Sequence, residues 1–418
     1  MMRLITHQHT AFQRRAIKLT FPRFCEVSTP LRLKFQSSTF VMKISRRELV
    51  GLVMGFSSAS TSGLVMSLTQ KKYLEIDRQR SLPFLVGWYD RIENIDVSSK
   101  VYPKGMRLIM PYVAKDVKPE TIRAFLARAK QVGMKVLLEI YRPLVESENI
   151  SGIRNFIRTY KNHPAVYGWY LYDEPEVKKP IPLSPQLLIG LYQVIKQEDR
   201  SKPVAIVFAD TRKIAPYIDA LDILMWDWYP CHENEPEFHW VSGYRQDLYK
   251  VIALASTNKK KFYSVLQAYS DKTLKLSLPT QAEIRYMFYL SIGSGVDGIL
   301  FYMQYLSTKS WNESILYPMI KEFGKYIPAV IKGKNISDAL KINSSDIQIK
   351  LFSIPNTKKY VTIAINHSAI ATNLTVNFDR RLAGKQVITN RSKITQLPNR
   401  QGFRTLLKPY EVLVCEIG

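Results

Sequence analysis

Short apolar runs alternate with longer segments of helical periodicity between residues 81 and 335. Eight of the runs are rich in β-branched and aromatic residues and have the length of buried strands. They cover residues 83–89, 106–113, 135–141, 166–172, 204–209, 223–229, 262–268 and 298–303. Alternation of this kind predicts parallel βα units, and eight is the number of strands that a closed (β/α)8 barrel needs.

The segments between the runs carry helix signals. In residues 119–132, Ile122, Phe125, Leu126 and Ala129 fall on one face, as in a helix that packs against a sheet. Residues 184–185 (Ser-Pro) and 279–283 (Pro-Thr-Gln-Ala-Glu) are typical of helix starts. A doubly wound open sheet would also alternate β and α, but no Gly-rich nucleotide turn follows the first run, which favours the barrel.

The periodicity changes to two after about residue 336. Residues 347–351, 360–366, 374–376 and 410–414 predict short strands separated by turn-rich stretches. We therefore expect a small antiparallel β-sandwich over residues 336–418, after the barrel of residues 81–335.

The first eighty residues have a different composition, with 14 Lys/Arg against 4 Asp/Glu. Ser-Arg-Arg-Glu-Leu at 45–49, followed by the apolar run 50–56, resembles a twin-arginine export signal. We interpret 42–80 as a signal or uncleaved membrane anchor with a linker, and 1–41 as a disordered extension upstream of a start at Met42. The mature protein is then expected in the periplasm or outside the cell, or anchored to the membrane.

Charge and cysteine content restrict the partners. The whole chain carries a formal net charge of +25, and 46 Lys/Arg against 31 Asp/Glu remain after residue 80. A basic surface attracts acidic polysaccharides or membrane headgroups, and no nucleic-acid-binding motif is present, so we expect no nucleic acid partner. Cys231 and Cys415 fall in different predicted domains, and no Cys/His cluster has zinc spacing. We expect a monomer with no metal and no cofactor.

In a barrel, the carboxyl ends of all strands face one opening, so polar residues there converge although they are distant in sequence. The residues at these ends are Trp88, Tyr89, Asp90, Glu139, Tyr141, Asp173, Glu174, Asp210, Asp227, Tyr229, Gln267, Tyr269, Tyr302 and Gln304. Carboxylates and amides bind sugar hydroxyls, and aromatic rings stack on sugar C–H faces. Cleavage of an acetal needs an acid that protonates the leaving oxygen, and a second carboxylate or a substrate group.

The sharpest local signal is the aromatic strand 168–172, which ends abruptly in Asp173-Glu174-Pro175. Carboxyl groups placed against an apolar strand end have raised pKa values, as a general acid requires. Glu174 is therefore the candidate acid, with Asp173 or Asp227 assisting. The alternative is that Asp173 and Glu174 only cap the next segment, and Glu176 is expected to be solvated.

Asp173-Glu174-Pro175 resembles the Asn-Glu-Pro acid/base motif of glycoside hydrolase clan A, which closes the fourth barrel strand. The resemblance implies that Glu174 is the acid/base and that Asp173 replaces the clan's Asn. The clan's nucleophile is a Glu at the end of the seventh strand, where this chain has Gln267. The Asp-Glu pair is also similar to hexosaminidase-type barrels, in which the Asp orients the acetamido group of the substrate as nucleophile.

The barrel also resembles uncharacterised hydrolase-like proteins that share the Asp-Glu-Pro, Asp-x-Tyr-Pro and Leu-Gln-Ala strand ends and the Pro-Thr-x-x-Glu helix start. Asp227 could instead serve as base for an inverting attack, if it lies about 6.5–9.5 Å from Glu174. We expect Glu283 to make a structural contact with Arg285 or a nearby loop, whereas Glu139 either lines the cleft or supports a salt bridge.

The predicted function is a glycosidase or transglycosylase that acts on a polysaccharide or oligosaccharide. A saccharide-binding barrel that has lost its nucleophile, with Gln267 in its place, is the alternative. A structural protein of the cell envelope is the third possibility.

Overall fold

The computed structural model describes residues 31–35, 38–42, 84–113, 115–177, 182–389 and 394–418. It divides into two units, residues 1–77 and 78–418. In the first unit the described part is an antiparallel hairpin of β1 (Leu31–Phe35) and β2 (Ser38–Met42). Apart from this hairpin, the predicted extension 1–41 and the predicted signal 42–80 lie outside the described residues.

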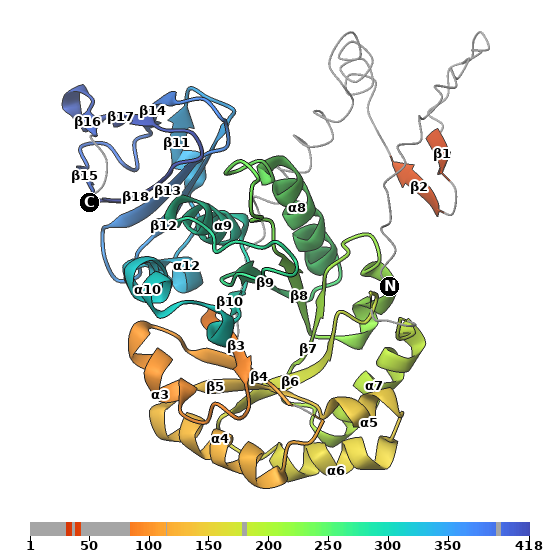
Figure 1. Cartoon of the computed structure of the whole chain (residues 1–418). Coiled ribbons are helices and arrows are strands. Elements are labelled where there is room, and N and C mark those ends of the chain that lie inside the picture. Colours follow the sequence, from red (N-terminus) through yellow and green to blue (C-terminus); the bar gives the residue numbers. More distant parts are fainter. Residues whose placement is uncertain (1–30, 36–37, 43–83, 114, 178–181, 390–393) are drawn as a thin grey trace, which may run out of the picture. The chain divides into compact units, whose positions relative to one another are not determined.

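Eight parallel strands of the second unit form a closed barrel, as predicted (Figure 1). They are β3 (Leu85–Arg91), β4 (Leu108–Tyr112), β5 (Lys135–Glu139), β6 (Val166–Asp173), β7 (Val204–Phe208), β8 (Ile223–Trp228), β9 (Lys261–Gln267) and β10 (Gly298–Tyr302). The barrel closes because β10 pairs with β3 on one side and with β9 on the other. Each predicted run overlaps one of these strands.

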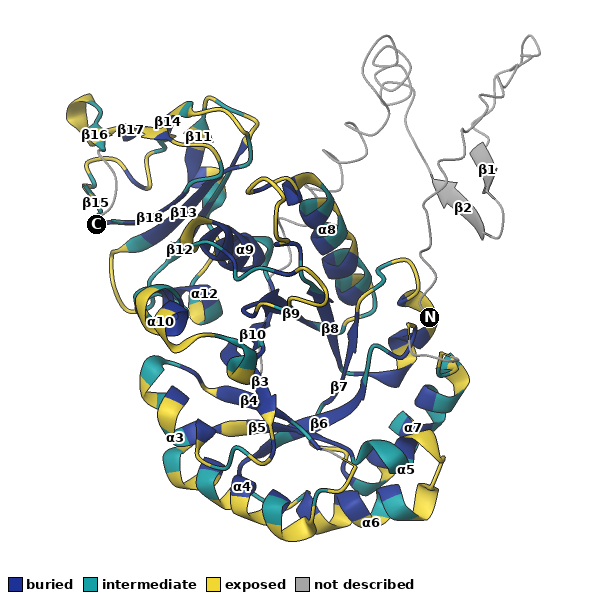
Figure 2. Ribbon diagram, in the orientation of Figure 1, coloured by how far each residue is buried: buried dark blue, intermediate teal, exposed yellow. Residues whose placement is uncertain are grey.

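Helices surround the strands, and those of residues 119–132 and 150–160 bury an apolar face and expose the opposite one (Figure 2). The longer ones are α4 (Pro119–Val132), α6 (Ile150–Tyr160), α7 (Pro185–Glu198), α8 (Val241–Thr257) and α9 (Gln281–Ser294). Shorter elements are α3 (Val97–Val101), α5 (Arg142–Glu146), α10 (Lys309–Trp311), α11 (Tyr317–Gly324), α12 (Ile327–Lys332), η1 (Tyr102–Lys104), η2 (Ala215–Ala220), η3 (Gln304–Leu306), η4 (Asn312–Leu316), η5 (Ser337–Ala339) and η6 (Pro398–Arg400). None of the described helices is both long and apolar enough to span a bilayer.

Helix starts follow the predicted chemistry. The Ser184 hydroxyl accepts a hydrogen bond from the Leu187 backbone N–H at 3.1 Å, with Pro185 in the first turn of α7. Thr280 and Glu283 form a reciprocal capping box at the start of α9. These caps satisfy backbone N–H groups that have no partner within the helix.

Two apolar layers build the barrel. One lies between the strands and the helices, and includes Trp88, Trp169 and Trp226. The other fills the barrel interior and includes Tyr89, Tyr170 and Met225. The barrel is therefore a packed core, and a binding site has to lie at one of its ends.

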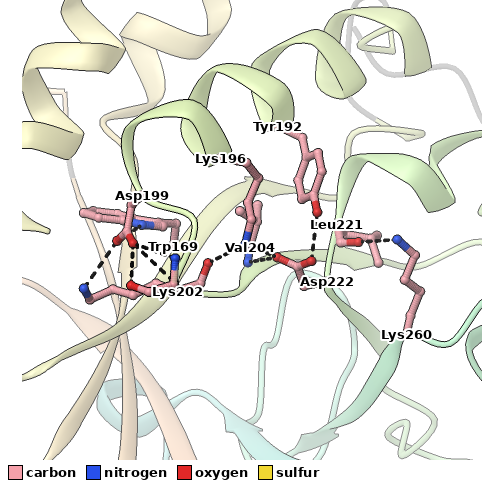
Figure 3. A network of polar contacts seen from close by, with 10 residues as sticks. Trp169, Tyr192, Lys196, Asp199, Lys202, Val204, Leu221, Asp222 and Lys260 are labelled. Carbon is pink, nitrogen blue, oxygen red and sulfur yellow. Dashed lines mark hydrogen bonds and ion pairs between the residues drawn. The ribbon is translucent and has the colours of Figure 1, made fainter.

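A polar network ties α7 to the amino ends of β7 and β8 (Figure 3). Asp222 accepts hydrogen bonds from the Val204 backbone N–H at 3.0 Å and from the Tyr192 hydroxyl at 2.8 Å. Asp199 accepts one from the Trp169 indole at 3.1 Å. Because these groups pair with one another, this end of the barrel is a structural end, and the chemistry is expected at the other.

The C-terminal region is a β-sandwich, as predicted. One antiparallel sheet has the order β11 (Leu340–Ile342), β14 (Thr372–Phe378), β17 (Gly402–Leu407), β16 (Thr395–Gln396), and the other β12 (Ile347–Ser353), β13 (Tyr360–Asn366), β18 (Val412–Ile417), β15 (Val387–Ile388). Side chains from both sheets share one core. Helix α9 joins it to the barrel, since the Arg285 guanidinium contacts the Val412 carbonyl and Tyr286 hydrogen-bonds His367 at 2.8 Å.

Candidate active site

Strand β6 delivers two consecutive acids to the barrel opening. The register shifts between Tyr170 and Tyr172, so the usual alternation of side chains is broken and both Tyr170 and Asp173 point inward. Glu174 then adopts a left-handed backbone with φ of 47°, while its N–H donates to the Val207 carbonyl at 3.1 Å. This conformation is uncommon for a residue with a side chain, and it occurs mainly where the surrounding structure enforces it.

Asp173 is held by donors from three elements. The Tyr170 hydroxyl donates to its carboxylate at 2.5 Å, and the Tyr112 hydroxyl contacts both oxygens at 3.2 and 3.3 Å. The Arg142 guanidinium lies 3.7 Å away. The side chain is still 25 % exposed, so it has a fixed orientation and also reaches the space above the strands.

Glu174 and Asp227 form a carboxyl pair. Asp227 is buried near the end of β8, and its Oδ2 accepts a hydrogen bond from the Tyr229 hydroxyl at 2.8 Å. The contact between the two carboxyl groups raises the pKa of Asp227 and lowers that of Glu174, so the proton of the pair resides mainly on Asp227. The structure thus brings Glu174 and Asp227 together from two strand ends that are distant in the sequence.

Burial controls the protonation of this pair. It raises the pKa of Glu174 above its ordinary value, and the negative charge of Asp173 raises it further. Burial and the charges of Glu174 and Asp173 raise the pKa of Asp227 as well. The pair therefore keeps one proton at a pH at which exposed carboxyl groups have lost theirs, as a general acid must.

A cavity of about 480 Å³ opens beside Asp173. Its lining is Arg91, Glu93, Tyr112, Val113, Lys115, Glu139, Arg142, Asp173, Tyr302, Met303 and Tyr305. Glu139, for which the sequence leaves two roles open, has both, because it lines the cavity and pairs with Arg142 at 2.9 Å. It also accepts from the Val113 N–H, and burial raises its pKa to about 7 although Arg142 opposes this.

Tyrosine rings cover the mouth of the barrel next to these acids. The Tyr302 ring stacks on Tyr229 at a centroid distance of 5.2 Å and meets Tyr89 and Tyr269 edge to face at 5.4 and 5.0 Å. Tyr89, Tyr229 and Tyr302 are predicted site residues that the structure brings together, although Tyr89 is buried beneath the others. Gln304 follows in η3 and is half-buried.

Sequence reasoning missed Tyr112, Tyr170 and Arg142. Tyr112 lies near the end of a predicted strand, so its position could have identified it as a site candidate. Arg142 follows a strand end and starts a helix, and no sequence pattern indicated it. The predicted residue Tyr141 lies nearby and donates its hydroxyl hydrogen to the Lys115 carbonyl, which steadies the cavity wall.

The predicted positions of Trp88 and Asp90 have to be corrected. Side chains alternate along β3, so Tyr89 faces the interior while its two neighbours face the helices. Trp88 is fully buried and packs on Phe301 at 5.6 Å. Asp90 is equally buried and accepts hydrogen bonds from the Arg91 N–H and the Asn94 amide. Neither side chain lines the cavity.

The prediction that Gln267 binds substrate also has to be corrected. It has no exposed surface, and its amide nitrogen donates to the carbonyls of Cys231 at 3.0 Å and Ser277 at 2.8 Å. Its amide oxygen accepts from the Cys231 N–H at 2.8 Å. The side chain joins two loops and has no path to a substrate. Cys231 and Cys415 are both buried, free thiols.

Three other acidic residues bind to groups of the protein itself. The expectation that Glu176 is solvated is wrong, because it is 2 % exposed and accepts from the N–H groups of Ala209 and Asp210. Asp210 itself pairs with Arg212 at 2.8 Å. Glu283 caps α9 and accepts from the Trp240 indole at 3.2 Å, which confirms its structural role. Within the described residues, no group of His, Cys, Asp or Glu could hold a metal ion.

The comparisons agree with the fold. No family model and no curated protein matches the sequence. Among solved structures, a family 39 glycoside hydrolase from Bacteroides cellulosilyticus WH2 has a TM-score of 0.52 at 13 % identity, covering 80 % of each chain. An α-amylase from H. orenii has a TM-score of 0.52 at 9 % identity, covering 81 % of this chain and all of that one.

An Anoxybacillus α-amylase is similar too, with a TM-score of 0.51 at 10 % identity over 80 % of this chain and 98 % of that one. At these identities, the similarity shows the fold only. The roles of the site residues depend on their own geometry. This chain shares with those α-amylases a (β/α)8 barrel followed by a C-terminal β domain.

Proposed function

We propose that this protein is a glycoside hydrolase or transglycosylase that uses Glu174 as general acid/base. The observation that carries the proposal is the buried Glu174–Asp227 carboxyl pair at the carboxyl ends of the strands, whose raised pKa values favour retention of a proton next to Asp173, which lines a cavity. The similarity in fold to glycosidases supports it.

The geometry suggests a role for each acid. Glu174 donates its proton to the glycosidic oxygen as the C–O bond breaks, and that oxygen keeps the bonding electron pair. The pair holds one proton because two adjacent carboxyl groups cannot both ionise without a large cost, and that proton passes through Glu174 to the glycosidic oxygen. Asp173, oriented by Tyr112 and Tyr170, faces the developing positive charge or aligns a substrate group.

The contact between Glu174 and Asp227 also bears on the mechanism. An inverting reaction needs about 6.5–9.5 Å between its two carboxyl groups, so that a water molecule fits between them. Two carboxyl groups that hydrogen-bond to each other leave no such space. The arrangement therefore disfavours Asp227 as an inverting base and favours a substrate-assisted reaction in which Asp173 orients the internal nucleophile.

The proposal is tested with aryl glycosides and with plant and bacterial polysaccharides. We expect turnover by the parent protein and a loss of about 10²–10⁴-fold in kcat for Glu174→Gln, with less loss on aryl glycosides whose leaving group needs no proton. Glu120→Gln, on the exposed face of α4, is the matched control and should keep full activity. Turnover that survives in Glu174→Gln would exclude Glu174 as the acid.

A saccharide-binding barrel without catalysis is the second candidate, because Gln267 occupies the position of the clan's nucleophile and is locked between two loops. Binding without turnover in the parent, Glu174→Gln and Glu120→Gln proteins would favour it.

We also propose that the protein is exported, on the basis of the Arg46-Arg47 pair and the apolar run that follows. N-terminal sequencing of the mature protein tests this. A mature chain that begins near residue 80 supports export with cleavage, and a chain that retains residues 1–41 in the cytoplasm contradicts it.

A further inference from the structure

The cavity beside Asp173 carries three basic side chains from three different elements. Arg91 ends β3, Lys115 follows β4 and Arg142 begins α5. Glu93, Glu139 and Asp173 are the acids of the same lining. Whether the cavity attracts an anion depends on how many of these charges already have partners.

The inner acids are engaged within the protein. Glu139 is 2 % exposed and accepts from the Val113 N–H and the Arg142 guanidinium. Asp173 accepts from the hydroxyls of Tyr112 and Tyr170. Both carboxylates therefore point at donors of the wall, and Arg142 lies within ion-pair distance of both, so it offsets part of their charge.

The two outer basic residues of the cavity, Arg91 and Lys115, form no comparable pairs with described carboxylates. Lys115 is exposed and forms no ion pair with any described carboxylate. Arg91 is exposed as well and forms no ion pair among the described residues; its guanidinium lies 4.0 Å from the ring centroid of Tyr305 and hydrogen-bonds that side chain. Glu93 is near Arg91 but also exposed, so water screens its charge.

We propose, on the basis of the glycosidase function above, that this cavity is a subsite for an acidic sugar whose anionic group binds to Arg91 and Lys115. A carboxylate or a sulfate would pair with both cations through charge-assisted hydrogen bonds. The sugar ring would lie against the rings of Tyr302 and Tyr305, which line the same cavity.

The size and the surroundings agree with this assignment. About 480 Å³ is within the range of small-molecule pockets, roughly 300–1,000 Å³. Asp173 lines the cavity and precedes Glu174 in the chain, so a sugar held there lies next to the proposed acid. The excess of Lys and Arg after residue 80, 46 against 31 acids, would also draw a polyanionic chain toward the protein.

The test measures binding by calorimetry in the Glu174→Gln protein, so that it does not depend on turnover. The probes are oligomers of galacturonate, glucuronate and mannuronate, the methyl esters of the same oligomers, and a sulfated galactan oligomer. The esters keep the ring and remove the charge. Lys115→Gln and Arg91→Gln change the proposed contacts, and Lys118→Gln, an exposed lysine outside the cavity, is the matched control.

We expect at least one acidic oligomer to bind more tightly than its ester, and about tenfold weaker binding in Lys115→Gln and in Arg91→Gln, with Lys118→Gln within twofold of the parent. Preference for the uronates or for the sulfated oligomer identifies the anion. Equal binding of acids and esters, an equal loss in Lys118→Gln, or no binding of any acidic oligomer would overturn the proposal. Glu174-dependent turnover of a neutral glycoside in that case would leave the proposed function standing.

Discussion

The substitution Gln267→Glu places a carboxyl group where clan A enzymes have their nucleophile, and the structure predicts that it destabilises the protein without adding activity. The Gln267 amide nitrogen donates to two carbonyls, those of Cys231 and Ser277. A protonated glutamic acid can donate to only one of them, and an ionised one to neither. The remaining carbonyl would face an oxygen inside a fully buried site.

The magnitude follows from these contacts. One buried acceptor without a donor costs about 1–3 kcal/mol, and the close approach of two oxygens adds to this. We therefore expect Gln267→Glu to lower the free energy of unfolding by about 2–4 kcal/mol in acid. Burial raises the pKa of the new carboxyl in the folded state, so the folded protein binds the proton more tightly than the unfolded chain. The loss of stability must then grow as the pH rises above about 4.3, the ordinary pKa of Glu.

Urea unfolding of the parent, Gln267→Glu and Gln267→Met between acid and neutral pH is the assay. Gln267→Met keeps the length of the side chain and removes every hydrogen bond, so its loss of stability should not change with pH. Glycosidase activity is measured on the same samples. A Gln267→Glu protein that is as stable as the parent at neutral pH, or that gains turnover, would refute this role for Gln267.

Two further predictions concern buried charges outside the site. Burial raises the pKa of Asp90 from 3.8 to about 6, so the folded state binds this proton more tightly than the unfolded chain, and the free energy of unfolding falls by about 3 kcal/mol as the pH rises through this window. Thermal unfolding of Asp90→Asn should lack this fall. A variant with the same dependence of stability on pH as the parent would contradict the argument. Arg285 is 8 % exposed and pairs with Glu322 through two contacts of 2.9 and 3.0 Å. Arg285→Met should lower the free energy of unfolding in urea by about 3 kcal/mol, because it leaves the Glu322 carboxylate poorly solvated and without this partner. A loss below about 0.5 kcal/mol would show that the pair does not stabilise the fold.

The barrel can be predicted from the periodicity of the sequence, because the strands are compact apolar runs, helices such as α4 and α6 have an amphipathic face, and α7 and α9 begin with a cap. The sandwich is harder to predict. Strands β15 and β16 have only two residues each, and in β17 the polar Thr405 is buried while the apolar Leu406 is exposed, so hydrophobicity does not follow burial there. These elements form by pairing with other strands, and local patterns do not contain that information.

The candidate site is predicted where function depends on position at a strand end, as for Asp173, Glu174 and Asp227. The prediction fails where the direction of a side chain determines its role. Consecutive residues of a strand point to opposite sides, so Trp88 faces the helices while Tyr89 faces the barrel interior. The bulge in β6 that turns Asp173 inward and the left-handed backbone of Glu174 have no simple sequence signature.

The most direct test of the central claim is a pH titration of the carboxyl groups by ¹³C NMR, comparing the parent with Glu174→Gln and Asp227→Asn. The account predicts one carboxyl in the parent that stays protonated where exposed carboxyl groups are fully ionised, with a titration that changes in both variants because the proton belongs to the pair. If Glu174 and Asp227 both ionise together with the exposed carboxyl groups, the pair does not hold a proton and the proposed acid is lost.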